Sequence, residues 1–445
     1  MAANVVKMTE GKISGLLVRF AIPMVLGKVF QLMYVFVDTA VVGQHLGVAA
    51  LAALGCADFL NWFLFGIVDG ITQGFAIKMS QDYGAGDENS LRKVAGNSII
   101  LTIVSSIVLV IAGLAGSMPV LQLLGTPSDI IDLSYLYIAI LFIGAPVSFA
   151  YNLLSSMLRA LGDSKTPLIA IVVSSIVNVI LDVLFVMFFG WGIAGAAWAT
   201  VIAQAVSALY CFAVVKKIPV LRITRKHMQL DPGLSLKLFK IGLPLAFQNT
   251  VIAVGGMIVQ TVVNKVSVVF IASYTAVNKM YSLLDIAGTS LGYSVMTFVG
   301  QNAGAKKFDR VKAGMKTGFI MVMICSVVIT VAMLVFGRNI LSMFIDKKTE
   351  SALEIAFSYL KLMALWLPAL YVLWFVRCGI QGLGNTFIPM LSGVAEFIMR
   401  TGTALLLPLI LGETGIFYAE IFAWLGADLI LVPSYFVIIR SQEVL

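Results

Sequence analysis

The sequence contains little of what catalytic and metal centres are usually built from. Its 445 residues include only two histidines, His45 and His227, and both fall in segments that we predict to be loops. A zinc site or a histidine-based catalytic triad therefore has almost no side chains to use. The four cysteines lie far apart without paired spacing, which predicts neither a disulfide framework nor a metal site. Since no nucleophile and base share a suitable spacing inside an apolar run, we expect a protein that is not an enzyme.

Charged residues are scarce as well. They make up 12% of the chain, whereas hydrophobic residues make up 60%, against roughly 45–50% in soluble domains. The mean hydropathy is +1.00. Apolar runs of about 20 residues are long enough to cross a bilayer core of about 30 Å. We predict an all-α integral membrane protein without a cleavable signal peptide. Its twelve expected spans are 18–42, 52–79, 95–117, 132–156, 167–189, 192–215, 238–263, 272–298, 315–337, 353–377, 387–411 and 415–438.

The net charge of +8 could suggest nucleic acid, but the positions of the basic residues argue against that partner. Lys and Arg gather in alternate loops, above all in 216–240, whereas the loops near 43–52, 117–131 and 189–192 contain none. The loop around Arg338 breaks this pattern. By the positive-inside rule, both termini are predicted to be cytoplasmic, in a multi-pass protein of the inner membrane. The basic excess thus reports topology, and we expect no nucleic acid and a monomer.

The second half of the chain reads as a diverged copy of the first. Four pairs of residues recur at separations of 221, 218, 218 and 222 positions: Pro23 and Pro244, Gly86 and Gly304, Arg92 and Arg310, Pro167 and Pro389. Two equivalent membrane lobes are the signature of a transporter whose substrate binds between repeats. We predict an N-lobe of helices 1–6 over residues 1–215, a cytoplasmic linker over 216–236 and a C-lobe of helices 7–12 over 237–445.

Pro23 and Pro244 occupy equivalent places near the start of each lobe's first span. One interpretation is a proline tolerated near the start of a helix. The other is a bend point, because a proline inside a helix removes a backbone hydrogen bond. The sequence leaves both interpretations open.

Polar residues inside the N-lobe spans predict a cation site. Asp38 lies on the same helical stripe as Gln31 and Tyr34, and Asp182 lies four residues from Asn178 on one face of its helix. Thr200 is on the next span. An ionised side chain in hydrocarbon costs roughly 2.5–3.5 kcal/mol, so two carboxylates there need a reason. Hard cations prefer oxygen ligands, and a buried carboxylate pair favours uptake of a proton or a cation. Lys28 could instead neutralise these carboxylates, as a structural alternative.

The other intramembrane charges are assigned to structure or to the cleft. Lys28 and Asp69 match in estimated depth and are predicted to pair, and Glu396 and Arg400 can pair at i, i+4. Asp285 and Asp428 lack an obvious local partner and, with Asn152, Gln31 and Tyr34, are candidate cleft residues for substrate. Cleft-facing Met and aromatic residues would suit a polyspecific site.

Several motifs in order along the chain resemble those of multidrug and toxic compound extrusion (MATE) transporters. They are Ala21-Ile-Pro-Met-Val25, Asp38-Thr-Ala-Val-Val-Gly43, Gly84-Ala-Gly-Asp87, Arg159-Ala-Leu-Gly-Asp163 and Gly300-Gln-Asn-Ala-Gly-Ala-Lys306. The resemblance extends from about residue 14 to 440. It implies the MATE fold, two six-helix bundles around a central cleft, with export of organic cations in exchange for H⁺ or Na⁺ by alternating access.

The resemblance also points to one branch of that family. Gln31, Tyr34, Asp38, Asn178, Asp182 and Thr200 match the N-lobe cation-site pattern of its DinF-like members. The NorM-like branch characteristically has an acidic residue in the seventh span, where this chain has Gln248 and Asn249. A DinF-like assignment follows, with H⁺ or Na⁺ as the coupling ion and no organic cofactor or resident metal.

Two other transport functions are weighed against multidrug efflux. A lipid or lipid-linked oligosaccharide flippase of the same superfamily would need a cationic cleft for pyrophosphate, whereas the N-lobe spans are net acidic. A channel is disfavoured because twelve helices in two lobes do not form a symmetric ring of subunits around a pore.

Overall fold

The described chain is helical, and every predicted span matches one helix or two consecutive helices to within a few residues at its ends. The computed structural model describes residues 4–342 and 350–441, except the side chain of Phe59. The first six spans correspond to α1 (Ile13–His45), α2 (Gly47–Ala85), α3 (Glu88–Leu123), α4 (Ile131–Ile143) with α5 (Ala145–Ala160), α6 (Lys165–Asp182) with the π-helical η1 (Val183–Phe188), and α7 (Gly192–Val215). A short 3₁₀ turn, η2 (Pro219–Leu221), follows.

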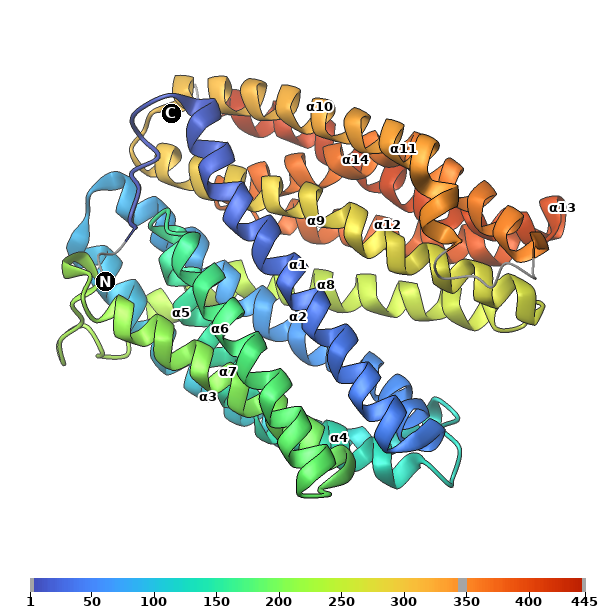
Figure 1. Cartoon of the computed structure of the whole chain (residues 1–445). Coiled ribbons are helices and arrows are strands. Elements are labelled where there is room, and N and C mark those ends of the chain that lie inside the picture. The colour runs from blue at the N-terminus through green and yellow to red at the C-terminus, as the bar shows by residue number, and fades with distance from the viewer. Residues whose placement is uncertain (1–3, 343–349, 442–445) are drawn as a thin grey trace. The chain divides into compact units, whose positions relative to one another are not determined.

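The last six spans follow the same plan (Figure 1). They are α8 (Pro232–Val263), α9 (Val268–Gly304), α10 (Phe308–Leu341), α11 (Glu350–Gly382), α12 (Phe387–Leu406) with the short α13 (Pro408–Leu411), and α14 (Tyr418–Ser441). The 3₁₀ segment η3 (Gly412–Phe417) separates the last two spans. Within the described residues, ten helical stretches are long and apolar enough to cross a membrane, and the bent α4–α5 pair makes an eleventh. Because η3 divides the longest stretch, Phe387–Ser441, into two, the prediction of twelve spans is confirmed.

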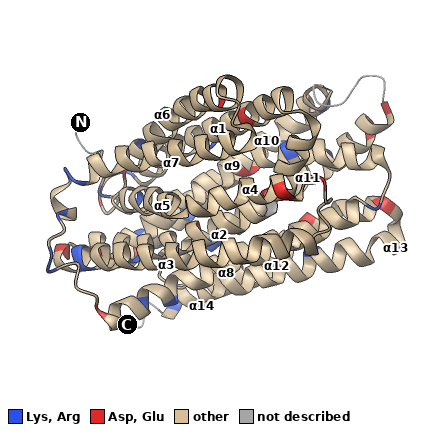
Figure 2. Ribbon diagram, turned by 90° about the horizontal axis from the view of Figure 1, so that it is seen from below, with Lys and Arg blue, Asp and Glu red and all other residues tan. Residues whose placement is uncertain are grey.

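Charged side chains are sparse along these helices. Figure 2 shows long uncharged stretches, with Lys, Arg, Asp and Glu found mainly toward helix ends and loops. This distribution fits helices whose middle turns lie in hydrocarbon.

The described chain divides into two compact units. Unit 1 comprises the chain up to Met8 together with Ile22–Phe247, and unit 2 comprises Thr9–Ala21 with Gln248–Leu445. The same helix pairs pack in each: α2 on α5 and α6 on α7 in unit 1, and α9 on α11 and α12 on α14 in unit 2. The packing within each unit therefore repeats, as the sequence offset predicts.

The division falls inside α1 and α8, whereas the predicted boundary lay in residues 216–236. It falls within four residues of Pro23 in α1 and of Pro244 in α8. The segment 219–235 is bound to unit 1, because Arg92 donates to the carbonyl oxygens of Pro219 and Val220 at 3.2 Å each. Asn97 also accepts the backbone N–H of Asp231 at 3.0 Å.

The start of α8 packs closely against α2 in unit 1. A Cβ atom added at Gly74 would lie 2.4 Å from Cα of Gly242, and one added at Gly70 would lie 2.4 Å from the backbone nitrogen of Ala246. Small residues four positions apart on both helices permit this approach, as in other membrane helix pairs. In unit 2, the start of α1 meets α9, where the Ser294 hydroxyl donates to Leu17 O at 3.0 Å.

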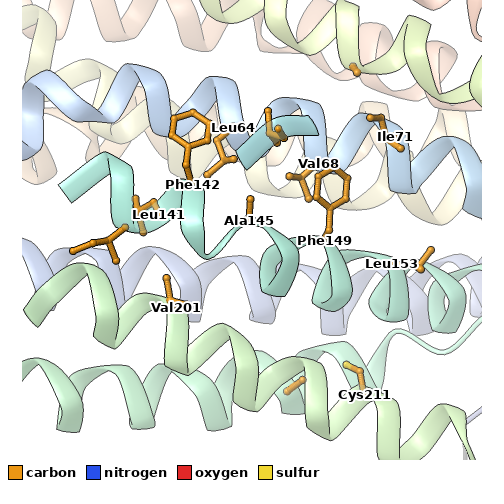
Figure 3. Packing of buried hydrophobic residues seen from close by; sticks show 14 of the residues in the cluster. Leu64, Val68, Ile71, Leu141, Phe142, Ala145, Phe149, Leu153, Val201 and Cys211 are labelled. Carbon is orange, nitrogen blue, oxygen red and sulfur yellow. The ribbon is translucent and has the colours of Figure 1, made fainter. Parts of the chain in front are cut away.

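The fourth span is bent by 48° between α4 and α5. Pro146 occupies the first turn of α5, where it interrupts the backbone hydrogen bonds of a continuous helix. The adjacent Gly144 leaves room for Val201 of α7, since a Cβ there would come within 2.4 Å of Val201 Cγ2. Figure 3 shows the surrounding core, in which Phe142 and Phe149 of this span lie among Leu64, Val68 and Ile71 of α2.

Candidate functional site

The predicted N-lobe site is built from two helices of unit 1. Asp38 lies on α1, and Asn178 and Asp182 lie on the last turns of α6. Their exposed fractions are 8%, 1% and 0%, although most α1 side chains around Asp38 are exposed. Asp182 is followed directly by the π-helical η1, a distortion often found at functional sites. Two carboxylates and an amide, whose burial in hydrocarbon is energetically costly, are therefore among the buried side chains of unit 1.

These side chains also lack partners. Among the described residues, Asp38 Oδ1, both oxygens of Asp182 and both amide atoms of Asn178 are buried without a hydrogen bond. Asp38 and Asp182 are close enough to interact electrostatically. A buried carboxylate without a partner is stable only if it takes up a proton or a cation. The three residues therefore offer up to four oxygen atoms as ligands for a cation, and none of the three is a base that could neutralise the carboxylates.

Aromatic residues and a further acid surround this pair. Tyr34 is half-buried and lies within reach of the Gln31 side chain and of the carboxylates of Asp38 and Asp182. Tyr137 on α4 is 6% exposed and within reach of the same two acids. Asp58 on α2 also interacts electrostatically with Asp38.

Tyr137 was not identified from the sequence, and Asp58 was not assigned to this site. The signal that could have found Tyr137 is its estimated depth in the membrane, judged from its distance to the end of its helix. It lies six residues from the start of α4, much as Asp38 lies seven residues from the end of α1.

Two predicted residues bond to their own helices. The Thr200 hydroxyl donates to Ala196 O at 3.2 Å, and Asn152 Nδ2 donates to Ser148 O at 2.9 Å. The Thr200 oxygen still has lone pairs, because a hydroxyl that donates can also accept, and its place in the cation site stays a prediction. The proposed pairing of Lys28 with Asp69 stays a prediction.

Unit 2 contains a different polar centre, in which the acids are paired with bases. Arg377 of α11 forms a short ion pair with Glu396 of α12, and Arg400 lies 3.4 Å from Glu396 and 2.8 Å from Glu420 of α14. All four residues are at most 9% exposed. The four charges alternate in sign and sum to zero. The sequence indicated only the Glu396–Arg400 part of this network.

The remaining donors of the network are largely satisfied. Arg377 donates to Ser392 Oγ at 3.1 Å. With its amide oriented to suit both neighbours, Gln248 accepts from Arg377 Nε at 3.2 Å and donates to Pro389 O at 3.3 Å. Arg400 donates to Ile252 O at 3.2 Å. A network with this many bonds is a rigid link between α8, α11, α12 and α14.

The two predicted acids of unit 2 differ. Asp285 on α9 accepts a hydrogen bond from Trp374 Nε1 at 2.7 Å. Asp428 on α14 is partly exposed, but its buried Oδ1 has no hydrogen-bond partner among the described residues. It lies within electrostatic reach of Arg377 and Glu396.

Comparisons with known proteins agree with this architecture. The MatE family model matches residues 23–184 and again 244–406, at nearly the offset of the internal repeat. The chain is 31% identical over 411 residues to the "Probable multidrug resistance protein YpnP" of Bacillus subtilis (strain 168), covering 92% of this chain and 91% of that protein. It is 32% identical over 355 residues to the same bacterium's "Probable multidrug resistance protein YoeA", covering 78% and 76%. A crystal structure of MATE in the bent conformation shares the fold, with a TM-score of 0.91, 19% identity and coverage of 100% and 99%.

The repeated six-helix plan and the family match together define a multi-span membrane transporter and not an enzyme. The chain belongs to the MatE family, the multidrug and toxic compound extrusion transporters.

Proposed function

We propose that this protein is a secondary active antiporter of the DinF-like branch, which exports organic cations or similar amphipathic compounds in exchange for H⁺ or Na⁺. The observation that carries the proposal is the buried group of Asp38, Asn178 and Asp182, whose polar atoms have no protein partner among the described residues. Such a group is costly in hydrocarbon unless it exchanges a proton or cation. The names of the relatives YoeA and YpnP fit multidrug export.

The coupling follows from the direction of the ion gradients. H⁺ and Na⁺ are driven inward, so the carboxylates take up the ion while they are open to the outside. With its negative charge reduced, the pair opposes repacking around α1 less and attracts a cationic cargo less strongly. When the site opens to the cytoplasm, the ion dissociates and the recharged carboxylates attract the next cargo. Such a difference in the affinity for cargo between the ion-bound and ion-free states couples the ion gradient to export.

Transport in proteoliposomes tests this function. Purified protein is reconstituted, a pH or a Na⁺ gradient is imposed separately, and movement of a panel of organic cations is measured. We expect cargo to move against its gradient with one of the two ions, and Asp38→Asn and Asp182→Asn to abolish it. Gradient-independent movement of a lipid-linked oligosaccharide, with no movement of organic cations, would instead support a flippase.

We also propose that the protein lies in the inner membrane with both termini and the 216–236 segment in the cytoplasm. A cysteine placed at His45 should react with an impermeant reagent added from outside, whereas one at His227 should not. The parent protein, labelled in parallel, controls for its four own cysteines. Labelling only at His227 would reverse the proposed orientation.

A further inference from the structure

The four ion-paired residues at the polar centre of unit 2 balance in charge, and a further acid, Asp428, lies near them. Arg377 and Arg400 are balanced by Glu396 and Glu420, to which they are directly paired. Asp428 lies within electrostatic reach of this group but forms no ion pair with it in the described residues. An ionised Asp428 therefore adds a negative charge to which no base is bonded among the described residues. A surplus negative charge in surroundings of low dielectric attracts a single positive charge.

Helix α14 also has an unused hydrogen-bond donor, one helical turn from Asp428. Trp424 lies four residues before Asp428 on α14, so the two side chains share a face. Trp424 is 0% exposed, and its indole Nε1 has no partner among the described residues. Buried indole N–H groups are usually hydrogen-bonded, so an unpartnered one needs an explanation. One face of α14 thus offers an acceptor and a donor that the protein itself does not use.

A second aromatic ring, from α9, lies beside Trp424. The ring of Trp424 stacks on Tyr281 of α9, with centroids 6.0 Å apart and an interplanar angle of 14°. Tyr281 also lies within electrostatic reach of Asp285 and of three members of the network, which places it beside the same polar centre; these members are Arg400, Glu396 and Glu420. Aromatic rings attract cations and stack on flat ligands.

We propose that Asp428 and Trp424 form a cargo subsite on α14, in which the carboxylate binds the positive group of a monovalent aromatic cation and the indole N–H binds an acceptor atom of the cargo. This inference rests on the proposed export function and separates its two cations. The driving ion binds Asp38 and Asp182 in unit 1, and these carboxylates attract the cargo through their charge alone. The direct contacts that hold the cargo are those of Asp428 and Trp424 in unit 2. The Arg377–Glu396–Arg400–Glu420 network holds α14 in place. Because its charges cancel, it does not attract the cargo by net charge.

Equilibrium binding to detergent-purified protein, without any gradient, tests the subsite. The probes are tetraphenylphosphonium, a monovalent aromatic cation, and triphenylphosphine oxide, a neutral aromatic compound with one strong acceptor. Asp428→Asn should weaken tetraphenylphosphonium binding about tenfold or more and leave triphenylphosphine oxide unchanged. Trp424→Phe keeps an aromatic ring but removes the N–H, so it should weaken the oxide several-fold and leave the phosphonium nearly unchanged.

The matched control is Asp132→Asn, the same change at an exposed position in the first turn of α4, which should alter neither affinity. Size-exclusion profiles and unfolding temperatures show whether each variant is folded. Wild-type affinity of Asp428→Asn for tetraphenylphosphonium would overturn the subsite. So would a result in which this variant keeps its affinity and differs only in the number of protons exchanged per cargo molecule. Because binding is measured without a gradient, this result stands apart from the antiport test, which can succeed when the subsite fails.

Discussion

The two units solve the same problem, buried charge, in opposite ways. In unit 1, Asp38 and Asp182 are buried with no base bonded to them in the described residues. In unit 2, Glu396 is bonded to both Arg377 and Arg400. Paired charges stay in place, because removing either partner leaves the other charge unpaired in a medium of low dielectric, which is energetically costly. Unpaired acids are exchangeable, since they can be satisfied by an ion that arrives and leaves. From this comparison we propose that ions exchange in unit 1 and that the paired network keeps unit 2 rigid.

The largest expected effect is on transport by unit 1. Asp38→Asn and Asp182→Asn each remove the charge difference between the ion-bound and ion-free states, so gradient-driven export should fall about 100-fold or more. Thermal unfolding should change little, because neither carboxylate makes a hydrogen bond that is lost. Asp428→Asn should be milder in the same proteoliposome assay. Wild-type export by both unit 1 variants would move the coupling site to Asp285, Glu396 or Asp428.

The second prediction concerns the stability of unit 2. Glu396→Gln leaves two buried guanidinium groups short of a carboxylate and should destabilise the protein by about 3–5 kcal/mol. Unfolding of detergent-purified protein measures this loss. Glu350→Gln is the matched control, because Glu350 pairs with Arg338 at 3.5 Å but is exposed, and such pairs contribute about 0–1 kcal/mol. Equal effects of the two substitutions would show that the buried network does not stabilise unit 2.

Most of the fold was predictable from sequence, and the comparison of the units shows which part of the chemistry was not. The twelve spans follow from apolar runs, and the acid site follows from residues spaced along α1 and α6. The pair Glu396–Arg400 was visible because its members are four residues apart on one helix. Arg377 and Glu420 were missed because they meet this pair across helices. Arg377 also stood at the predicted edge of its span, whereas α11 continues to Gly382.

The third prediction tests the close approach of α2 and α8 in unit 1. Gly74→Ala places a methyl group against the backbone of Gly242, and overpacking of this kind costs about 1–3 kcal/mol. Gly55→Ala is the control on the same helix α2, where a Cβ meets nothing within 4 Å. There the substitution should stabilise by about 0.5–1 kcal/mol. Unfolding measurements that gave both variants the same sign would contradict the close approach of α2 and α8.

The smallest expected effect comes from the repeated arginines, which bind the chain leading into α8 and α1. Arg92 donates to the carbonyl oxygens of Pro219 and Val220, and Arg310 donates to that of Gly11 at 2.8 Å. In each unit this bond holds the segment before a helix that passes into the other unit, which explains why the motif recurs. Hydrogen bonds from charged groups contribute about 1.5–3 kcal/mol when buried and less when partly exposed, as here.

Arg92→Ala and Arg310→Ala should therefore each lower stability by about 1 kcal/mol and act locally. Limited proteolysis should cut near residues 219–231 faster in Arg92→Ala, and near residues 9–12 faster in Arg310→Ala. Arg222→Ala, which removes a basic side chain within the linker itself, is the control and should leave cutting near 9–12 unchanged. If cutting accelerated at the same place in both arginine variants, each arginine would not hold its own segment, and the repeated motif would need another explanation.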